Sequence, residues 1–279
     1  MLTAIREDGK KVYAHEVYRE DGDKYYCPEC GSELILRQGT KNIWHFSHKE
    51  DNGICVFRKY DNESLPHKLM KKTIKEIVEE YNTCLVSDLE HRVGSKIADY
   101  YFEVKNRFGG VSKVAVECVQ THTDIDVFRA KNEYYVKRGV YVIWLFNLTR
   151  FLNKDNSFKD EVRVNEMIKE CHTMYFGKVY AIDIINKAIY GIHLEKILRE
   201  TEDTEYVDWS EWDEFEYQED YFEEHTIVVP GRKYYLKGTR SLNPKLIKDF
   251  AVTSFKKALN DNFLPYRRNV ANVWMKPWW

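Results

Sequence analysis

The sequence lacks long hydrophobic runs, and it has no apolar leader at its start. Its longest apolar run, Tyr141 to Phe146, is far too short to cross a bilayer, which takes about 20 residues. The opening residues turn polar at once, which is not how a signal peptide begins. We therefore expect a cytoplasmic protein with no membrane partner.

Neither sign of charge is in clear excess, since the formal net charge is only −2 over 279 residues. The whole chain consequently has no electrostatic footprint of the kind that DNA-binding proteins show. The six cysteines are scattered apart from one Cys-x-x-Cys pair, which favours a reducing compartment and a metal site over a disulfide framework. Contents of 43% hydrophobic and 32% charged residues indicate a globular protein with one good core and a small satellite, or two modest domains.

The Cys-x-x-Cys pair, Cys27 and Cys30, is followed by His45, His48 and then Cys55. Two short turns with cysteine and histidine supply the four ligands that structural Zn²⁺ takes in tetrahedral geometry. In a strand, two histidines three positions apart point to opposite faces, so we favour His48 and Cys55 and keep His45 as the alternative. The competing interpretation is that these are ordinary buried thiols and a packed histidine.

Hydrophobic patterning predicts an α/β fold with a mixed central sheet. Residues 1–60 contain short strands and turns around the zinc motif. Ser64 is the expected N-cap of a helix whose apolar stripe includes Met70, Ile74, Ile77 and Val78. The elements expected after it are strands at 84–86, 96–104, 113–119 and 140–146, and a helix at 124–138 that Thr123 would cap.

The last third of the chain divides by charge. A helix is expected at 158–171 and a hairpin at 178–194. The segment 200–224 is acidic and aromatic without lysine or arginine, whereas 232–279 is strongly basic and includes an expected helix at 243–260. The acidic segment could dock a protein partner or mimic nucleic acid, or it could simply be solvated. The basic tail could follow a nucleic-acid backbone or complete the core.

Asp99 and Glu117 lie inside apolar strands, where a carboxylate is costly unless something neutralises it. Two carboxylates on neighbouring strands form a hard oxygen site for Mg²⁺ or Mn²⁺, and metal-assisted attack on a phosphodiester is the chemistry that follows. The alternative is an ion pair with one of the nearby cations Lys96, Lys113 or Arg129.

The order of these parts resembles the competence protein CoiA family, in which a PD-(D/E)XK-type nuclease core follows a small zinc-binding segment. The resemblance spans about residues 1–147. It rests on Tyr26 to Gly31, His45 to His48, Glu63 and Ser64 with His67 and Lys71, Asp99, Glu117, and Tyr135 and Gly139 before Val142 to Trp144. It implies a zinc-ribbon-like segment at 1–60, a restriction-endonuclease-like core at 61–150 acting on DNA, and an α+β C-terminal region at 151–279.

Carried over to this chain, the resemblance makes Asp99 and Glu117 the metal carboxylates. Glu63 or His67, at the start of the first helix, would complete the metal shell or hold water. The family pattern also asks for a lysine or glutamine two residues after the glutamate, where this chain has Val119.

Two residues could replace the missing group at that position. Gln120 lies one residue later, and a β-bulge would bring it to the site. Lys131 on the next helix could instead stabilise the charge that develops on the phosphate. His122, which follows the same strand, could contact a phosphate, and its role stays open.

The function expected from the sequence is a metal-dependent DNA nuclease with structural Zn²⁺ and catalytic Mg²⁺ or Mn²⁺, in competence and recombination or in phage defence. The alternative is a catalytically impaired DNA- or protein-binding module on the same fold, which the valine at position 119 favours.

Overall fold

The computed structural model describes residues 1–49, 55–57, 63–80, 84–105, 110–120, 124–175, 177–202 and 226–241. The acidic segment beyond residue 202, the basic tail beyond 241, the expected helix at 243–260, and His122 and Thr123 lie outside these residues. Among the described helices, none is long and apolar enough to cross a membrane.

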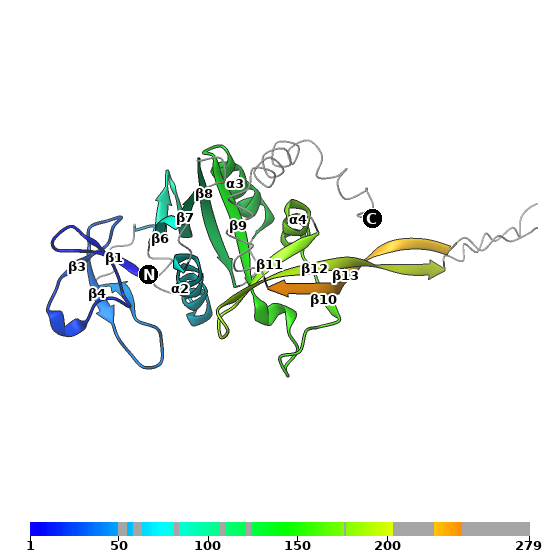
Figure 1. The fold of residues 1–279 in the computed structure, drawn as a ribbon, viewed down its shortest axis with the longest axis horizontal. Helices are drawn as coiled ribbons and strands as arrows, with labels where there is room; N and C mark the ends of the chain where they lie inside the picture. Colours follow the sequence, from blue (N-terminus) through cyan, green and yellow to red (C-terminus); the bar gives the residue numbers. More distant parts are fainter. Residues whose placement is uncertain are drawn as a thin grey trace, which may run out of the picture.

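Residues 1–49 and 55–57 form a small β unit, hereafter the N-terminal unit, at one end of the molecule in Figure 1. Its antiparallel sheet has the order β2-β1-β3-β4-β5. The strands are β1 (Thr3–Arg6), β2 (Lys11–Tyr13), β3 (Tyr25–Tyr26), β4 (Glu33–Arg37) and β5 (His45–His48), with a 3-10 turn at Arg19–Asp21. One face of this small sheet is buried in a separate hydrophobic core, which includes Tyr25, Leu34, Leu36 and Phe46.

Helix α2 (Leu65–Glu79) begins where the sequence predicts. The Ser64 hydroxyl accepts a hydrogen bond from the His67 N–H at 3.4 Å, which satisfies one of the free donors of the first turn. The predicted apolar stripe of Met70, Ile74, Ile77 and Val78 is buried, and it packs the helix on the main sheet. His67 and Lys71 are therefore held on a fixed helix surface.

The main sheet has eight strands in the order β10-β13-β12-β11-β9-β8-β7-β6. Their bounds are β6 (Cys84–Val93), β7 (Lys96–Lys105), β8 (Val111–Val119), β9 (Val140–Asn147), β10 (Glu161–Arg163), β11 (Lys178–Asp183), β12 (Ala188–Glu202) and β13 (Thr226–Ser241). Strand β9 runs parallel to β8 and β11, and the other pairs are antiparallel, so the predicted mixed sheet is confirmed. Helices α3 (Ile125–Val136) and α4 (Glu166–Met174) pack beside β9 and β11 (Figure 1).

The chain order α2-β6-β7-β8-α3-β9 therefore builds one half of the sheet, and the strands from β10 onward extend the same sheet. Every residue of β9 is buried, as its apolar run predicts for a strand covered on both faces. The antiparallel pair of β12 and β13 projects away from the body of the molecule in Figure 1.

Three local predictions are wrong. The strand expected at 84–86 extends to the ten residues of β6. The mostly polar sequence from Ser87 to Arg92 does not show the alternation of a strand, because several of these residues contact the N-terminal unit. The helix expected at 158–171 begins only at Glu166, because Val162 pairs with β13 and Asn165 caps the helix. Asp124, rather than Thr123, caps α3 by accepting from two backbone N–H groups.

Candidate functional site

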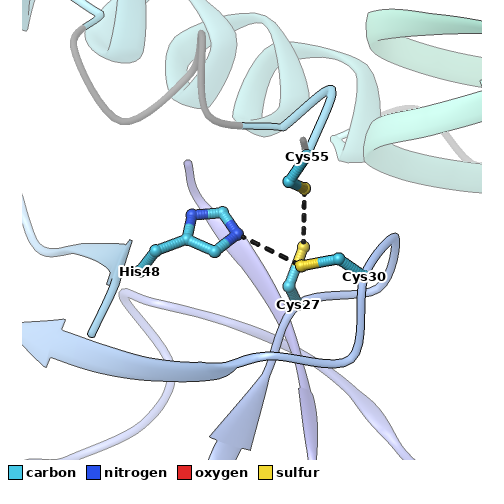
Figure 2. Close-up of side chains that lie close together, drawn as sticks. All are labelled: Cys27, Cys30, His48 and Cys55. Atoms are coloured by element: carbon cyan, nitrogen blue, oxygen red, sulfur yellow. Dashed lines mark hydrogen bonds between the residues drawn. The ribbon is translucent and has the colours of Figure 1, made fainter. Parts of the chain in front are cut away.

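Four side chains of the N-terminal unit converge on one point: Cys27, Cys30, His48 and Cys55 (Figure 2). Cys27 Sγ lies 3.5 Å from Cys55 Sγ, and Cys30 Sγ lies 3.5 Å from His48 Nε2. Tetrahedral zinc with bonds of about 2.3 Å to sulfur and 2.0–2.1 Å to nitrogen separates its ligands by about 3.6–3.8 Å. The donor set and its spacing fit zinc.

The turn after β3 aims the first two ligands. Gly31 has φ 68°, and its N–H bonds to the Cys27 carbonyl, which folds the Cys-x-x-Cys segment back on itself. Burial raises the pKa of the Cys27 thiol. Burial opposes ionisation of Cys30 as well, but hydrogen bonds involving Ser32, Cys55 and His48 outweigh it and lower the pKa of that thiol to about 6.

Both histidines of the motif lie on β5, but only His48 is in the group of four. His45 instead makes a hydrogen bond of 2.8 Å from its Nδ1 to the Ile43 carbonyl. The structure thus brings together the set that the strand argument favours and leaves the alternative histidine outside it.

A second group lies in the main sheet, where strands β7 and β8 separate. Their ladder ends at the pair Tyr100 and Val116, so Asp99 and Glu117 come directly after the last pair. The Asp99 carboxylate turns to accept the backbone N–H of Cys118 at 2.8 Å. Asp99 and Glu117 are almost completely buried, at 5% and 3% exposure.

Asp99 groups with Glu63 and His67, each of which offers an atom within 4.8 Å of the others. His67 Nε2 lies 3.3 Å from Asp99 Oδ2 and 3.6 Å from Glu63 Oε1. This nitrogen is buried and makes no well-aligned hydrogen bond with any described residue, although it lies within ion-pair distance of both carboxylates. One imidazole nitrogen and two carboxylate oxygens at this spacing could hold a metal ion.

Burial and neighbouring charges shift the pKa values of all three residues of this group. Burial alone would lower the pKa of His67, but its interaction with Asp99 and the charge of Glu63 raise it. Burial alone would raise the pKa of Asp99, but His67, Lys71 and Lys131 lower it well below its usual range. Burial raises the pKa of Glu63 against the opposing charge of Lys71. The shifts of His67 and Asp99 therefore each favour the charged form of the group.

Glu117 lies beside this group and has partners of its own. Lys131 of α3 donates to Glu117 Oε2 at 2.5 Å, and the Tyr135 hydroxyl donates to Oε1 at 2.6 Å. Burial is the largest cause that raises the pKa of Glu117 to about 7, opposed by Lys131 and reinforced by Asp99. A carboxyl whose pKa lies near neutrality in a buried polar cluster is typical of functional sites.

Gln120 is not brought to these carboxylates. The register of β8 against β9 is regular as far as Val119, so the described part of β8 has no bulge that would turn Gln120 inward. Its side-chain oxygen accepts instead from Asn147 at 3.1 Å. Of the two residues that could replace the group missing at Val119, the structure brings only Lys131 to the site.

Sequence reasoning named Lys71 and Tyr135 in the resemblance without giving them a role in the site, and it missed Glu90. Lys71 is fully buried and bridges Glu63 Oε2 at 2.6 Å and Glu90 Oε1 at 2.8 Å, and Tyr135 holds Glu117. The four-residue spacing from His67 to Lys71 was the available signal for the lysine. Glu90 lies among charged residues of β6, and nothing in that local sequence distinguishes it from a solvated acid.

Comparison with known proteins gives two matches. The family model for the N-terminal domain of competence protein CoiA matches residues 9–57, which hold all the zinc-motif residues. Competence protein CoiA of Bacillus subtilis (strain 168) is 22% identical over 135 residues. That alignment covers 48% of this chain and 34% of the relative, so the chain spans about a third of the protein that it matches.

No solved structure matches this chain. The two sequence matches agree with the motifs, and they support a CoiA-like family for this chain.

Proposed function

We propose that this chain is a metal-dependent DNA nuclease with a restriction-endonuclease-like core. The observation that carries the proposal is the convergence of Glu63, His67 and Asp99, with the pair of Glu117 and Lys131 beside them. The element order α2-β6-β7-β8-α3-β9 supports it, because His67 lies on the first helix, Asp99 and Glu117 on the following strands and Lys131 on the next helix.

The donor set suits a divalent cation. A bound cation would activate a water molecule and offset the negative charge of the phosphate. Two carboxylates and one imidazole nitrogen form a mixed set that fits Mn²⁺ and suits Mg²⁺ less well, since Mg²⁺ prefers oxygen ligands. We therefore propose Mn²⁺ or Mg²⁺ there and a structural zinc ion in the N-terminal unit.

The side chains divide the remaining tasks. Asp99, fixed by the Cys118 N–H, holds its carboxylate toward the ligand group. Lys131 supplies a positive charge that can follow the phosphate as charge develops on it, and Tyr135 keeps Glu117 in place when the lysine moves. In this arrangement Lys131 takes the role of the lysine or glutamine that position 119 lacks.

Plasmid and single-stranded DNA cleavage with Mg²⁺ or Mn²⁺ tests the proposal. We expect Asp99→Asn, Glu117→Gln and Lys131→Met each to reduce cleavage by about 10²-fold or more. Glu170→Gln is the matched control, because Glu170 is a buried, ion-paired acid on α4 outside the ligand group. Cleavage that survives both carboxylate changes would overturn the assignment.

A second proposal is a catalytically impaired module that binds DNA or protein on the same fold. The observation that favours it is Val119 in the position of the usual catalytic group, with Gln120 bonded to Asn147. DNA binding by such a module would persist without divalent metal and would be indifferent to Glu117→Gln. Competence, recombination and phage defence are the settings proposed for either activity, inside the cell and with DNA as the partner.

A further inference from the structure

Glu90 has a backbone conformation that its place in the sheet does not explain. It lies in the middle of β6 with φ 50°, in the left-handed region that residues with a Cβ atom rarely adopt. The ladder with β7 continues in the same register on both sides of it, from Leu89 opposite Tyr100 to His91 opposite Ala98. Such strain persists only where the surroundings over-determine it, and it concentrates at functional sites.

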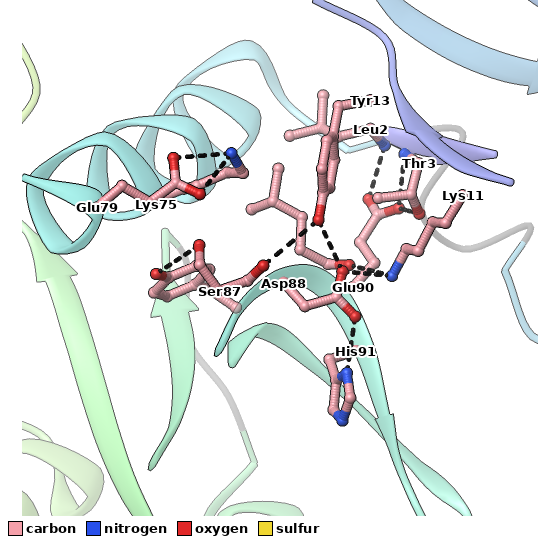
Figure 3. Close-up of polar contacts among 12 residues, drawn as sticks. Leu2, Thr3, Lys11, Tyr13, Lys75, Glu79, Ser87, Asp88, Glu90 and His91 are labelled. Carbon is pink, nitrogen blue, oxygen red and sulfur yellow. Dashed lines mark hydrogen bonds and ion pairs between the residues drawn. The ribbon is translucent and has the colours of Figure 1, made fainter. Parts of the chain in front are cut away.

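The surroundings of the Glu90 carboxylate come from two separate parts of the fold. From the N-terminal unit, the Leu2 N–H donates to Oε1 at 2.8 Å, and the N–H and hydroxyl of Thr3 donate to Oε2 at 3.2 and 2.7 Å (Figure 3). From α2, Lys71 donates to Oε1 at 2.8 Å. The carboxylate is buried and accepts from the N-terminal unit and the main core at once.

Lys71 extends this connection to the ligand group. The ammonium group is fully buried, and it lies between Glu90 and Glu63 Oε2. Lys71 thereby fixes one oxygen of Glu63 and leaves the other, Oε1, toward His67. A buried ammonium needs both anions, because removing one partner of a buried ion pair leaves an uncompensated charge.

The N-terminal unit docks along the same strand at further points. Lys11 and the Tyr13 hydroxyl bond to Asp88 at 2.7 and 2.9 Å, as Figure 3 shows. Glu29, which lies between two of the zinc ligands, forms an ion pair with Arg92. Strand β2 and the zinc turn are thus tied to β6 on either side of Glu90, at Asp88 and Arg92.

We propose that Glu90 is a positioning residue that couples docking of the zinc-bearing N-terminal unit to the geometry of the Glu63, His67 and Asp99 cation group. The proposal rests on the proposed function, since it assumes that this group binds a cation. With the unit docked, Glu90 shares the charge of Lys71, and Glu63 keeps one oxygen for the cation. With the unit undocked, Lys71 turns fully to Glu63 and competes with the cation.

The test is Mn²⁺ affinity of the full chain, measured by the loss of the free-ion EPR signal, for wild type and Glu90→Gln. We expect the variant to stay folded by circular dichroism and to bind Mn²⁺ at least tenfold more weakly. Glu103→Gln is the matched control, because it removes a charge from the neighbouring strand β7, where the carboxylate accepts from the Tyr101 hydroxyl at 2.6 Å. It should leave the Mn²⁺ affinity unchanged.

A double-mutant cycle separates positioning from simple loss of negative charge. If Glu90 acts through Lys71, the effects of Glu90→Gln and Lys71→Met on Mn²⁺ affinity are strongly non-additive, whereas a through-space charge effect adds. Zinc removal should likewise weaken Mn²⁺ binding in wild type and have little effect in Glu90→Gln. Additive effects, or an equal response to zinc removal, would overturn the coupling.

The outcomes also separate this inference from the proposed function. A wild-type chain that binds no Mn²⁺ would overturn both the cation site and the coupling. A wild type that binds Mn²⁺ and a Glu90→Gln variant that binds it equally well would overturn the coupling alone. Should Glu90→Gln fail to fold, Thr3→Val removes only the 2.7 Å hydroxyl bond, and we expect it to weaken Mn²⁺ binding about threefold.

Discussion

Replacing Glu117 by glutamine should abolish catalysis and yet stabilise the fold at alkaline pH. Burial raises the pKa of this carboxyl to about 7 from its ordinary 4.5, so the folded chain holds a proton that the unfolded chain has released. Stability from this group is full below pH 4.5 and is lost as pH rises toward 7, because the unfolded state then binds fewer protons than the folded state.

The magnitude follows from those two values. At about 1.4 kcal/mol per pH unit between them, the ionised carboxyl weakens folding by about 3 kcal/mol at pH 8 and by about 1 kcal/mol at pH 5. Glutamine resembles the protonated acid, so its contacts with Lys131 and Tyr135 change little with pH. The stability of Glu117→Gln relative to wild type should therefore increase by about 2 kcal/mol from pH 5 to pH 8.

Urea unfolding at four pH values, without added divalent cation, measures this difference. Asp88→Asn is the opposite case, because contacts with His91, Lys11 and Tyr13 outweigh burial and lower the pKa of Asp88. Its loss should destabilise the chain at neutral pH, and the difference from wild type should shrink as pH falls below 4. A Glu117→Gln variant that is equally destabilised at every pH would refute the reasoning and make Glu117 an ordinary ion-pair partner.

Three further changes test other parts of the site. Cys27→Ser should reduce bound zinc from one equivalent to less than about a tenth by elemental analysis, whereas Cys84→Ser, a thiol outside the group, should leave it unchanged. Mn²⁺ should bind more tightly as pH rises, until the raised pKa of His67 is passed, because the imidazolium and the cation compete; isothermal titration in two buffers should detect the released proton. Lys131→Met should reduce DNA cleavage by about 10²-fold while Gln120→Ala changes it by less than about threefold; the reverse order would place glutamine in the site.

The sequence predicted those elements whose patterns are local. The stripe of α2 and the apolar run of β9 identify their elements without any knowledge of tertiary contacts, and the spacing of the zinc motif has its own chemistry. The length of β6 was underestimated, because its polar residues include Glu90, which is buried against a segment 87 and 88 residues earlier in the sequence. The length of β6 could not be predicted from the alternation of apolar and polar residues alone.

The site was predictable to the same degree. Asp99 and Glu117 stand out because acids are rare in apolar strands, and a helix residue such as His67 is found through its place in the motif order. The partners of these residues are different. Glu90 has a special conformation, and Lys71 is buried between two acids, and both facts depend on how β1, α2 and β6 meet in space. No periodic pattern in the sequence predicts the contacts among these three elements.

The charges of the described site balance in a way that supports a divalent cation. Its carboxylates are Glu63, Glu90, Asp99 and Glu117, and its lysines are Lys71 and Lys131. The Met1 amino group also acts on this cluster, and its charge helps to lower the pKa of Glu90. The pKa values of His67 and Glu117 are both raised, each partly by the charge of a neighbouring carboxylate. A divalent cation at the Glu63, His67 and Asp99 group would offset the same negative charge without a rearrangement of the lysines. A network built only for stability would need no such group of buried carboxylates, because buried charges cost free energy that hydrophobic contacts would not.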